Sequence, residues 1–442
     1  MIRMTLADLA ARIGATTSDD PGVTVTGLTT DSRVVEPGDL FVAISGESFD
    51  GNRFIAAAVA AGAAAVVTSD RSISGIPRIV VADTLVALRD IAAIRRDELQ
   101  IPVVAITGST GKTSTKDLLA AALPGSWSSP KSFNNEVGVP LTVLSTPDDA
   151  KFLVAEVGSR GRGHIEFLMP AVRPDVSVVT NLGVVHLETF GTTDVLADAK
   201  FELVEALPAH GVAVLPADES RLRRDHPGTT MTFGVSDQAD VQVLAIEIDD
   251  NGYPSFEIRC EQGSVPVRLA VAGAHQALNA AAAVAAGLAL GADFETLVER
   301  IQKATGSAWR MEIHRGRFTV VNDAYNANPD SMEAAMRTVA AMPGRHLAVL
   351  GTMAELGPLE AAEHRRIGEL AVELGFASVL TVGAEPGIAA AAGPIGRNVS
   401  DTEMAESLLR GMVRDGDVVL VKASRAIGLE SLALELAKVA NA

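Results

Sequence analysis

The chain reads Val103-Val-Ala-Ile-Thr-Gly-Ser-Thr-Gly-Lys-Thr-Ser-Thr-Lys116 in one stretch. Its apolar, β-branched beginning predicts a buried strand, and the glycines Gly108 and Gly111 end that strand before a helix over 112–123. Backbone amides in a glycine loop, the positive end of a helix dipole and the Lys112 ammonium together make a binding site for phosphate. We therefore predict that this segment binds the phosphates of a nucleotide.

The spacing of this loop differs from the strict Walker pattern. That pattern requires glycine at position 106, where the chain has Ile106, so the loop is the shorter Gly-x-x-Gly-Lys-Thr form. The hydroxyl of Thr113 follows the lysine and is placed to hold Mg²⁺. An ordinary strand-to-helix turn is the alternative, but such a turn seldom combines two glycines, a lysine, a threonine and a preceding apolar strand.

The composition is that of a large globular protein with an acidic balance of charge. Its 442 residues suggest about three domains. The formal net charge of −18 argues against nucleic acid or a membrane surface as a partner. The single Cys260 excludes an intramolecular disulfide and a cysteine-based zinc site. We find no signal peptide and no integral membrane segment, so we expect a cytoplasmic protein.

The order of the predicted elements indicates an α/β protein of three domains. Residues 1–98 mix short strands and helices and form a small first domain. Residues 99–309 alternate between apolar strands and helices, as a central ATPase-like domain with a parallel sheet does, and 240–270 read as an antiparallel insert or edge. Residues 310–442 begin a second alternating series, which predicts a doubly wound, Rossmann-like domain. The central strands are expected at 102–106, 152–157, 176–181 and 212–215, and those of the last domain at 318–322, 346–350, 378–382 and 417–421.

Polar residues at the ends of the central strands are candidates for a metal site. Glu156 ends the strand over 152–157, beside the phosphate loop, and is well placed to reach Mg²⁺; a solvated carboxylate is the alternative. His186 follows the strand over 176–181. A lone histidine in such a place is more often structural, but together with Glu156 and the loop a metal ligand is favoured.

Three further features allow two interpretations each. Lys200 lies on a predicted helix among acids, and from the residues alone it is better explained as a surface lysine in salt bridges. The segment Asp323-Ala-Tyr-Asn-Ala-Asn-Pro-Asp-Ser331 follows a strand and precedes a helix, so it is either a ligand-facing loop or a helix cap with solvated neighbours. Arg310, at the junction of the last two domains, either supplies charge for a phosphate or forms a surface ion pair.

Together these segments resemble the Mur ligase family, the ATP-dependent amide-bond ligases of bacterial cell-wall synthesis. The resemblance spans nearly the whole chain. It is carried by Thr30-Asp-Ser-Arg33, Gly38-Asp-Leu-Phe-Val-Ala43, Gly46-Glu-Ser-Phe-Asp-Gly51, Thr107 to Thr113, Asn134-Asn-Glu-Val-Gly-Val-Pro-Leu-Thr142, Thr180-Asn-Leu-Gly-Val-Val-His-Leu-Glu188, Asp323-Ala-Tyr-Asn-Ala-Asn-Pro-Asp-Ser-Met332 and Leu350-Gly-Thr-Met-Ala-Glu-Leu-Gly357.

The resemblance implies an activity and its partners. The expected reaction joins D-alanyl-D-alanine to UDP-N-acetylmuramoyl-tripeptide, with ATP forming an acyl phosphate, and the first domain would bind the UDP substrate. The Asn-Ala-Asn-Pro-Asp-Ser-Met run separates this activity from that of the sibling that adds the third residue, whose Asp-Asn-Pro-Arg motif is absent here. The identity of the third residue, lysine or a diamino acid, is left open. We expect a monomer.

The resemblance also implies roles for individual residues. The catalytic residues would be Lys112, Lys200, Glu156 and His186, and two Mg²⁺ ions would be held by Thr113, Glu156, His186 and a carbamylated Lys200. ATP would be bound by Gly108, Ser109, Thr110, Gly111, Lys112, Thr113, Ser114, Asn279, Arg310 and Asp323. The other substrates would be bound by Ser32, Arg33, Asn134, Asn135, Tyr325, Asn326 and Asn328. The chain departs from the family pattern at Gln276, Thr352, His164 and the 216–218 run.

Three other functions remain open. Another ligase of the same fold, such as folylpolyglutamate synthase or the third-residue ligase, would keep the ATP residues and change the outer pockets. A regulatory protein with a dead site would lack Lys112, Glu156 or His186, all of which are present. A phosphate-loop kinase would leave the last domain unexplained.

Overall fold

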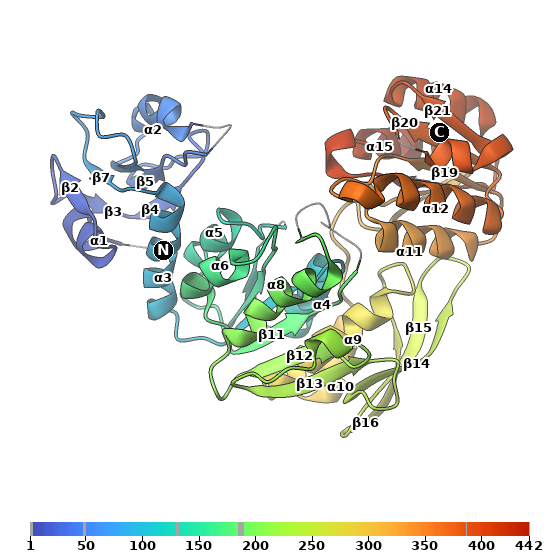
Figure 1. The fold of residues 1–442 in the computed structure, drawn as a ribbon, viewed down its shortest axis with the longest axis horizontal. Helices are drawn as coiled ribbons and strands as arrows, with labels where there is room; N and C mark the ends of the chain where they lie inside the picture. The colour runs from blue at the N-terminus through green and yellow to red at the C-terminus, as the bar shows by residue number, and fades with distance from the viewer. Residues whose placement is uncertain (1–2, 47–49, 130–131, 184–189, 386, 442) are drawn as a thin grey trace.

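The computed structural model describes residues 3–46, 50–129, 132–183, 190–385 and 387–441. Within these residues the chain forms three lobes, and each lobe is built on one β-sheet of five or more strands. The first and last lobes stand at the two ends of the central one (Figure 1). The predicted α/β class is therefore confirmed. The domain limits at 98 and 309 stay a prediction.

The first lobe has a mixed sheet in the order β2-β7-β6-β5-β4, in which β2 runs antiparallel to β7. A short ribbon, β1-β3, lies beside it. Its elements are β1 (Met4–Thr5), α1 (Leu6–Arg12), β2 (Thr16–Ser18), β3 (Thr24–Val25), β4 (Gly27–Thr29), β5 (Asp39–Val42), η1 (Gly51–Phe54), α2 (Ile55–Ala60), β6 (Ala65–Thr68), β7 (Arg78–Val80) and α3 (Thr84–Glu98).

The central lobe has a long sheet in the order β16-β15-β14-β13-β12-β11-β8-β10-β9. Strands β9 to β14 pair in parallel, whereas β14, β15 and β16 form the antiparallel edge expected between 240 and 270. The elements are β8 (Val103–Thr107), α4 (Lys112–Ala122), β9 (Ser126–Ser128), α5 (Gly138–Leu144), β10 (Phe152–Glu156), α6 (His164–Val172), β11 (Val176–Val179), α8 (Thr193–Glu205), β12 (Val212–Pro216), η2 (Ser220–Leu222), β13 (Thr229–Gly234), β14 (Val241–Ile248), β15 (Pro254–Cys260), β16 (Gly263–Arg268), α9 (Gln276–Ala289) and α10 (Phe294–Ile301).

Strand β8 is buried on both faces, which is why its sequence is continuously apolar. Val104 and Ile106 pack with residues of α4, α9 and α10, whereas Val103 and Ala105 pack with residues of α5 and α6 on the other face. Successive side chains of a strand point to opposite faces, so one run of apolar residues serves both layers. The core on the α5 and α6 side continues through α3 into the first lobe.

The last lobe is doubly wound, as predicted. Its sheet has the order β17-β18-β22-β19-β20-β21, and only β17 is antiparallel to its neighbour. Val321 packs with residues of α11 and α12, and the adjacent Val320 packs with residues of α14 and α15 on the opposite face. The elements are β17 (Glu312–Arg315), β18 (Thr319–Asn322), α11 (Pro329–Ala340), β19 (His346–Leu350), η3 (Gly357–Leu359), α12 (Glu360–Glu373), β20 (Ser378–Val382), α13 (Ile388–Ala391), η4 (Gly393–Ile395), β21 (Gly396–Val399), α14 (Thr402–Met412), β22 (Val418–Lys422), η5 (Arg425–Ile427) and α15 (Glu430–Ala440).

The sheet order brings particular strand ends together. In the central lobe β8 lies between β10 and β11, so the carboxyl ends of these three parallel strands share one edge. In the last lobe β18 lies beside β22, so Asn322 and Lys422 end neighbouring strands. Ligands of open α/β sheets bind at such edges. In the part of the chain that is described, no helix is long and apolar enough to cross a membrane.

Candidate active site

The predicted phosphate loop connects β8 to α4, and its shape depends on two glycines. Gly108 and Gly111 have φ values of 142° and 78°, which side chains with a Cβ rarely adopt. The surroundings leave no room for a side chain either. A Cβ on Gly108 would lie 1.9 Å from Thr180 Oγ1, and one on Gly111 would lie 2.3 Å from Asn279 Oδ1. Both glycines are therefore needed for close packing as well as for backbone conformation.

Asn181, at the end of β11, holds the other side of the loop. Its side-chain oxygen accepts from the Thr110 amide at 2.9 Å, and its carbonyl accepts from the Ser109 amide at 3.1 Å. The first amides of α4 have no acceptor within their own helix, which leaves them available to an anion. Asn181 was not identified from the sequence, although it follows an apolar strand and Glu156 ends one.

Lys112 is folded back over the loop. Its ammonium donates to the carbonyl of Gly108 at 2.7 Å and lies 3.4 Å from that of Ser109. Burial lowers the pKa of Lys112, and the positive charge of Arg310 lowers it further, whereas the nearby Glu156 carboxylate opposes the shift. The ammonium therefore lies against the loop, within reach of an anion bound there.

Oxygen atoms gather around Thr113 and Glu156. The Thr113 hydroxyl donates to Glu156 Oε2 at 2.8 Å and lies 2.9 Å from Ser132 Oγ, while the Asn134 amide donates to Glu156 Oε1 at 2.7 Å. A carboxylate with hydroxyl and amide oxygens is a donor set that suits Mg²⁺, which keeps much of its shell for phosphate and water. No cluster of three or more acidic, histidine or cysteine ligands occurs among the described residues, and His186 lies outside them.

Lys200 is buried, so the interpretation as a surface lysine in salt bridges is wrong. It lies on α8 with 1% of its surface exposed, yet it reaches the cavity that Lys112 also lines. Burial lowers its pKa well below that of an ordinary lysine; the charge of Lys112 adds to this effect and Glu202 opposes it. A lysine in this setting carries a neutral amine far more readily than one in water.

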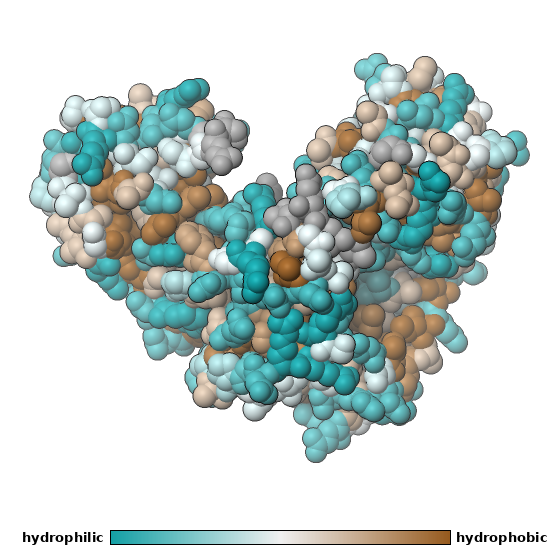
Figure 2. Space-filling view, viewed as in Figure 1, coloured by the Kyte–Doolittle hydropathy of each residue, from teal (hydrophilic) through white to brown (hydrophobic). Residues whose placement is uncertain are grey.

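Two cavities meet at the phosphate loop, and both are lined by residues of the central and last lobes. Figure 2 shows a wider hollow that separates the first lobe from the last. The first cavity, of about 370 Å³, contains the loop, Glu156 and Arg310. The second, of about 400 Å³, contains Lys200 and residues 424–426. The residues that line both are Ser109, Lys112, Asn134, Tyr325, Asn326 and Asn328.

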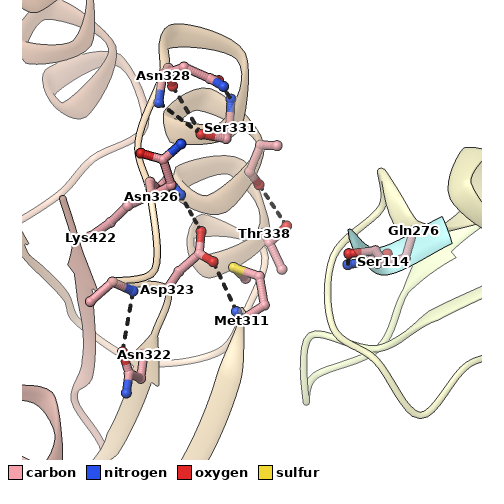
Figure 3. Close-up of polar contacts among 12 residues, drawn as sticks. Ser114, Gln276, Met311, Asn322, Asp323, Asn326, Asn328, Ser331, Thr338 and Lys422 are labelled. Carbon is pink, nitrogen blue, oxygen red and sulfur yellow. Dashed lines mark hydrogen bonds and ion pairs between the residues drawn. The ribbon is translucent and has the colours of Figure 1, made fainter. Parts of the chain in front are cut away.

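The far end of the first cavity has polar groups from two lobes. Asp323 accepts from the Met311 amide at 3.0 Å and pairs with the buried Lys422 at 2.5 Å (Figure 3). On the central lobe, Gln276 accepts from the Asn279 amide at 2.9 Å and lies 3.5 Å from the Ser114 hydroxyl. The predicted nucleotide residues from 109 to 114, Asn279 and Asp323 are thus brought to one cavity. Gly108 does not line it and packs against Thr180 instead.

Arg310 joins the last lobe to the phosphate loop. One guanidinium nitrogen donates to Thr113 Oγ1 at 2.9 Å and to Ser132 Oγ at 3.1 Å. The guanidinium carbon lies 4.0 Å from the centre of the Tyr325 ring, a distance at which cation–π attraction stabilises the pair. Of the two roles considered for Arg310, the geometry therefore favours charge for a phosphate.

The predicted residues for the other substrates do not all lie together. Tyr325 and Asn326 line both cavities, but Ser32 and Arg33 belong to the first lobe and line neither. Arg33 is mostly exposed and pairs with Asp31 at 2.6 Å, and hydrogen bonds from Arg33 lower the pKa of Asp31 to about 2.

Two predicted substrate asparagines also accept hydrogen bonds from the first turns of helices. Asn135 is not the N-cap residue of α5, which is Val137, but its Oδ1 accepts from the Gly138 amide at 2.8 Å, in the first turn of that helix. Asn328 Oδ1 accepts from the Ser331 amide at 2.9 Å and forms a capping box at the start of α11 (Figure 3). The 323–331 segment therefore does cap a helix, and because Asn328 also lines both cavities the ligand-facing interpretation stays a prediction.

The sequence reasoning missed Ser132, Lys422 and Arg425. Ser132 bonds Thr113, Lys422 pairs with Asp323, and Arg425 lines the second cavity. A signal for the last two was available, because Lys422-Ala-Ser-Arg425 follows the apolar strand predicted at 417–421. Polar residues directly after a buried parallel strand are as informative there as at Glu156.

Comparison with known proteins gives consistent matches along the chain. Residues 24–108 match the model of the Mur ligase family, catalytic domain, residues 106–287 match the Mur ligase middle domain, and residues 309–425 match the Mur ligase, glutamate ligase domain. The UDP-N-acetylmuramoyl-tripeptide–D-alanyl-D-alanine ligase of Mycobacterium tuberculosis is 37% identical, over 98% of this chain and 97% of that relative.

Solved structures agree over the same length. MurF from Acinetobacter baumannii superimposes with a TM-score of 0.91 at 30% identity, covering 99% of both chains. MurF ligase from Thermotoga maritima, solved in complex with ADP, has a TM-score of 0.84 at 28% identity, covering 94% of this chain and 97% of that one.

Proposed function

This chain belongs to the Mur ligase family, and we propose that its two adjoining cavities join D-alanyl-D-alanine to UDP-N-acetylmuramoyl-tripeptide at the expense of ATP. The protein is an ATP-dependent ligase of peptidoglycan precursor synthesis. One observation carries the assignment of the reaction to this site. Lys112 lines both the cavity with the phosphate loop and the cavity with Lys200, so a phosphoryl group on the loop faces the second cavity directly.

The chemistry explains why ATP is needed. A carboxylate is a poor acyl donor, because oxide is a poor leaving group. The terminal carboxylate of the tripeptide attacks the γ-phosphorus of ATP, which releases ADP and forms an acyl phosphate. The amine of D-alanyl-D-alanine then attacks the acyl carbon, phosphate leaves, and the amine loses its proton. Closure of the last lobe on the central lobe, held by Arg310, excludes water that would hydrolyse the intermediate.

The nucleotide lies in the first cavity. The glycine loop and the start of α4 bind its phosphates, and Lys112 leaves the Gly108 carbonyl to meet them. Asn279 contacts the base side and Asp323 the ribose. Arg310 supplies a second positive charge near the transferring phosphoryl group, where charge stabilisation matters most.

The metal ligands would be Thr113, Glu156 and His186, with a modified Lys200 for a second ion. Mg²⁺ bound there neutralises charge on the phosphate oxygens. The contacts of Thr113 with Glu156 and Ser132 support the first site. Burial lowers the pKa of Lys200, so its amine is more readily neutral, and the neutral amine is the form that captures CO₂. The resulting carbamate would give this lysine an anionic group that can bind the second ion.

The two other substrates occupy the second cavity and the first lobe. Asn134, Asn135, Tyr325, Asn326 and Asn328 would contact the peptide and the dipeptide around the reacting carbonyl, since four of them line both cavities and Asn135 lines the second. Ser32 and Arg33 would bind the UDP end of the sugar nucleotide. The first lobe stands at one end of the central lobe (Figure 1), an arrangement that suits a substrate with its reactive carboxylate at the end of a peptide.

We further propose three properties of the whole protein. The chain divides into domains at about residues 98 and 309, it acts as a monomer, and it works in the cytoplasm, the compartment that supplies ATP. Limited proteolysis tests the two proposed domain boundaries. Light scattering at the working concentration tests whether the protein is a monomer.

Phosphate release tests the function. The complete mixture contains ATP, Mg²⁺, UDP-N-acetylmuramoyl-tripeptide and D-alanyl-D-alanine, and each component is omitted in turn. We expect release at enzymatic rates only from the complete mixture, with the dipeptide becoming part of the UDP-linked product. Release that does not depend on the peptide substrates would instead indicate a simple ATPase, and none at all would indicate a regulatory protein with a dead site.

A further inference from the structure

The second cavity has one arginine from the last lobe, Arg425, which no step above uses. It begins η5, directly after the end of β22, and it lines the cavity together with Lys112 and Asn326. Its side chain is 53% exposed. The guanidinium is thus at the cavity surface and accessible to a ligand.

Neighbouring groups orient the guanidinium and leave part of its edge available. Its carbon lies 4.6 Å from the centre of the Trp309 ring and 5.9 Å from that of Tyr325. Nη1 donates to Glu430 Oε1 at 2.9 Å. Among the described residues, no hydrogen bond is recorded from Nε or Nη2. Stacking restricts the guanidinium plane, and the bond to Glu430 restricts its rotation, so the group is preorganised for an anion.

The acceptor of the proposed reaction needs such a group. D-Alanyl-D-alanine has a neutral amine when it attacks and a carboxylate at its other end. A carboxylate that enters a partly buried cavity must be paired, and arginine binds carboxylates through two parallel hydrogen bonds. Both arginines lie over the Tyr325 ring, but Arg310 lines the first cavity and Arg425 lines the second. The two arginines therefore face different ligands.

We propose that Arg425 binds the terminal carboxylate of the dipeptide acceptor. Glu430 and the Trp309 ring hold the Arg425 side chain in place. This inference rests on the proposed function. It makes Arg425 a specificity residue, because an acceptor without a carboxylate leaves the guanidinium unpaired. Among the other basic residues of the cavity, Lys112 belongs to the phosphate loop, Lys200 to α8, and Arg160 and His164 to the segment of the central lobe after Glu156.

The test compares D-alanyl-D-alanine with its C-terminal amide on three proteins: the parent, Arg425→Gln and Arg410→Gln. Arg410 is a half-exposed arginine of the same lobe that pairs with Glu406 at 2.6 Å and lines neither cavity. We expect the parent and Arg410→Gln to prefer the acid to the amide by about 10- to 100-fold in kcat/KM, as expected for a charged hydrogen-bonded pair. Arg425→Gln should lose this preference through a rise in KM for the acid, with kcat/KM for the amide nearly unchanged.

A structural role for Arg425 would lower kcat/KM for both acceptors equally, and that result would overturn the proposal. Loss of the preference in Arg160→Gln with Arg425→Gln unaffected would overturn it as well, because the carboxylate would then lie on the central lobe.

Hydroxylamine separates this proposal from the proposed function. It is a small uncharged nucleophile that attacks the acyl phosphate, forms a hydroxamate and releases phosphate, so it needs no carboxylate site. Arg425→Gln should form the hydroxamate from ATP and UDP-N-acetylmuramoyl-tripeptide at close to the parent rate. If the parent forms none, the acyl phosphate mechanism itself fails. If the parent forms it and Arg425→Gln does not, Arg425 acts before the acceptor and the assignment to the carboxylate is overturned.

Discussion

Arg310 and Thr113 are 197 positions apart in the chain, yet the arginine donates a 2.9 Å hydrogen bond to the threonine hydroxyl. The bond crosses from the start of the last lobe to the phosphate loop of the central lobe. The same guanidinium stacks on Tyr325, which lines both cavities. One side chain thus links the position of the last lobe to the residues that would bind phosphate and metal.

Arg310→Lys should lower kcat/KM for ATP by about tenfold or more. Lysine keeps the charge but loses the planar fork and the stacking on Tyr325, and the removal of one preorganised donor at a developing charge commonly costs at least this much. Arg315→Lys is the control, because Arg315 is an exposed residue of β17 outside both cavities. Equal ATP kinetics in the two variants would remove Arg310 from the nucleotide site.

Lys112→Ala should reduce turnover by about 10²- to 10³-fold, which is typical when a group that stabilises transition-state charge is lost. Its stability should change little, because the side chain is only half-buried and the desolvation of its ammonium offsets the hydrogen bonds to two loop carbonyls. Turnover and the thermal midpoint are measured together, with Lys303→Ala as the control, since Lys303 is an exposed lysine paired with Glu299. Near-parent turnover in Lys112→Ala would contradict the assignment of the phosphate loop.

Gly111→Ala and Gly291→Ala separate backbone strain from crowding. Both glycines have a φ of 78°, but a Cβ on Gly291 has nothing within 4 Å, whereas one on Gly111 would lie 2.3 Å from Asn279 Oδ1. We expect Gly291→Ala to lose about 1–2 kcal/mol of unfolding free energy from strain alone. Gly111→Ala should lose more and should also bind ATP about tenfold or more weakly. Denaturant unfolding and nucleotide titration measure the two effects. Identical behaviour of the two variants would show that Asn279 does not constrain the loop.

Lys200→Ala should be nearly inactive and should regain part of its activity when short carboxylic acids are added. The acid would fill the space of the proposed carbamate and restore its charge. Lys200→Arg should not be rescued, because arginine still occupies the space and cannot be carbamylated. Full activity of Lys200→Ala would show that the buried amine has no part in the reaction.

The same proposal predicts a dependence on bicarbonate and pH. Burial and Lys112 lower the pKa of Lys200, so more of its amine is neutral at a given pH than in an ordinary lysine. Only the neutral amine captures CO₂, and we therefore expect activity lost after removal of bicarbonate to return on its addition at neutral pH. Activity that is insensitive to bicarbonate in protein known to carry an unmodified lysine would contradict carbamylation.

Much of the fold could be predicted from the sequence, because buried parallel strands have a strong pattern. The strand that becomes β8 is continuously apolar since both of its faces are covered, and the glycines after it mark the loop. Helix α5 was not predicted. It begins at Gly138 and has Pro140 in its first turn, where a proline needs no backbone donor but where the sequence suggests a turn.

The site was less predictable than the fold, for physical reasons that particular residues illustrate. Lys200 lies among acids on a helix, and periodicity does not reveal that the face bearing it is buried. The pairs Arg310–Thr113 and Asp323–Lys422 join residues about a hundred or more positions apart, and only the tertiary fold determines such contacts. The catalytic and binding roles of the site residues stay predictions, among them the role of His186, which lies outside the described residues.

The choice of acceptor tests the central claim most directly. ADP formation is followed with two substrate pairs, and the UDP-linked product is weighed by mass spectrometry. The first pair is UDP-N-acetylmuramoyl-tripeptide with D-alanyl-D-alanine, and the second is the corresponding UDP-dipeptide with lysine or diaminopimelate. We predict ADP formation and a product heavier by one dipeptide with the first pair, and neither with the second. The reverse pattern would contradict the account and make the protein the ligase of the third residue.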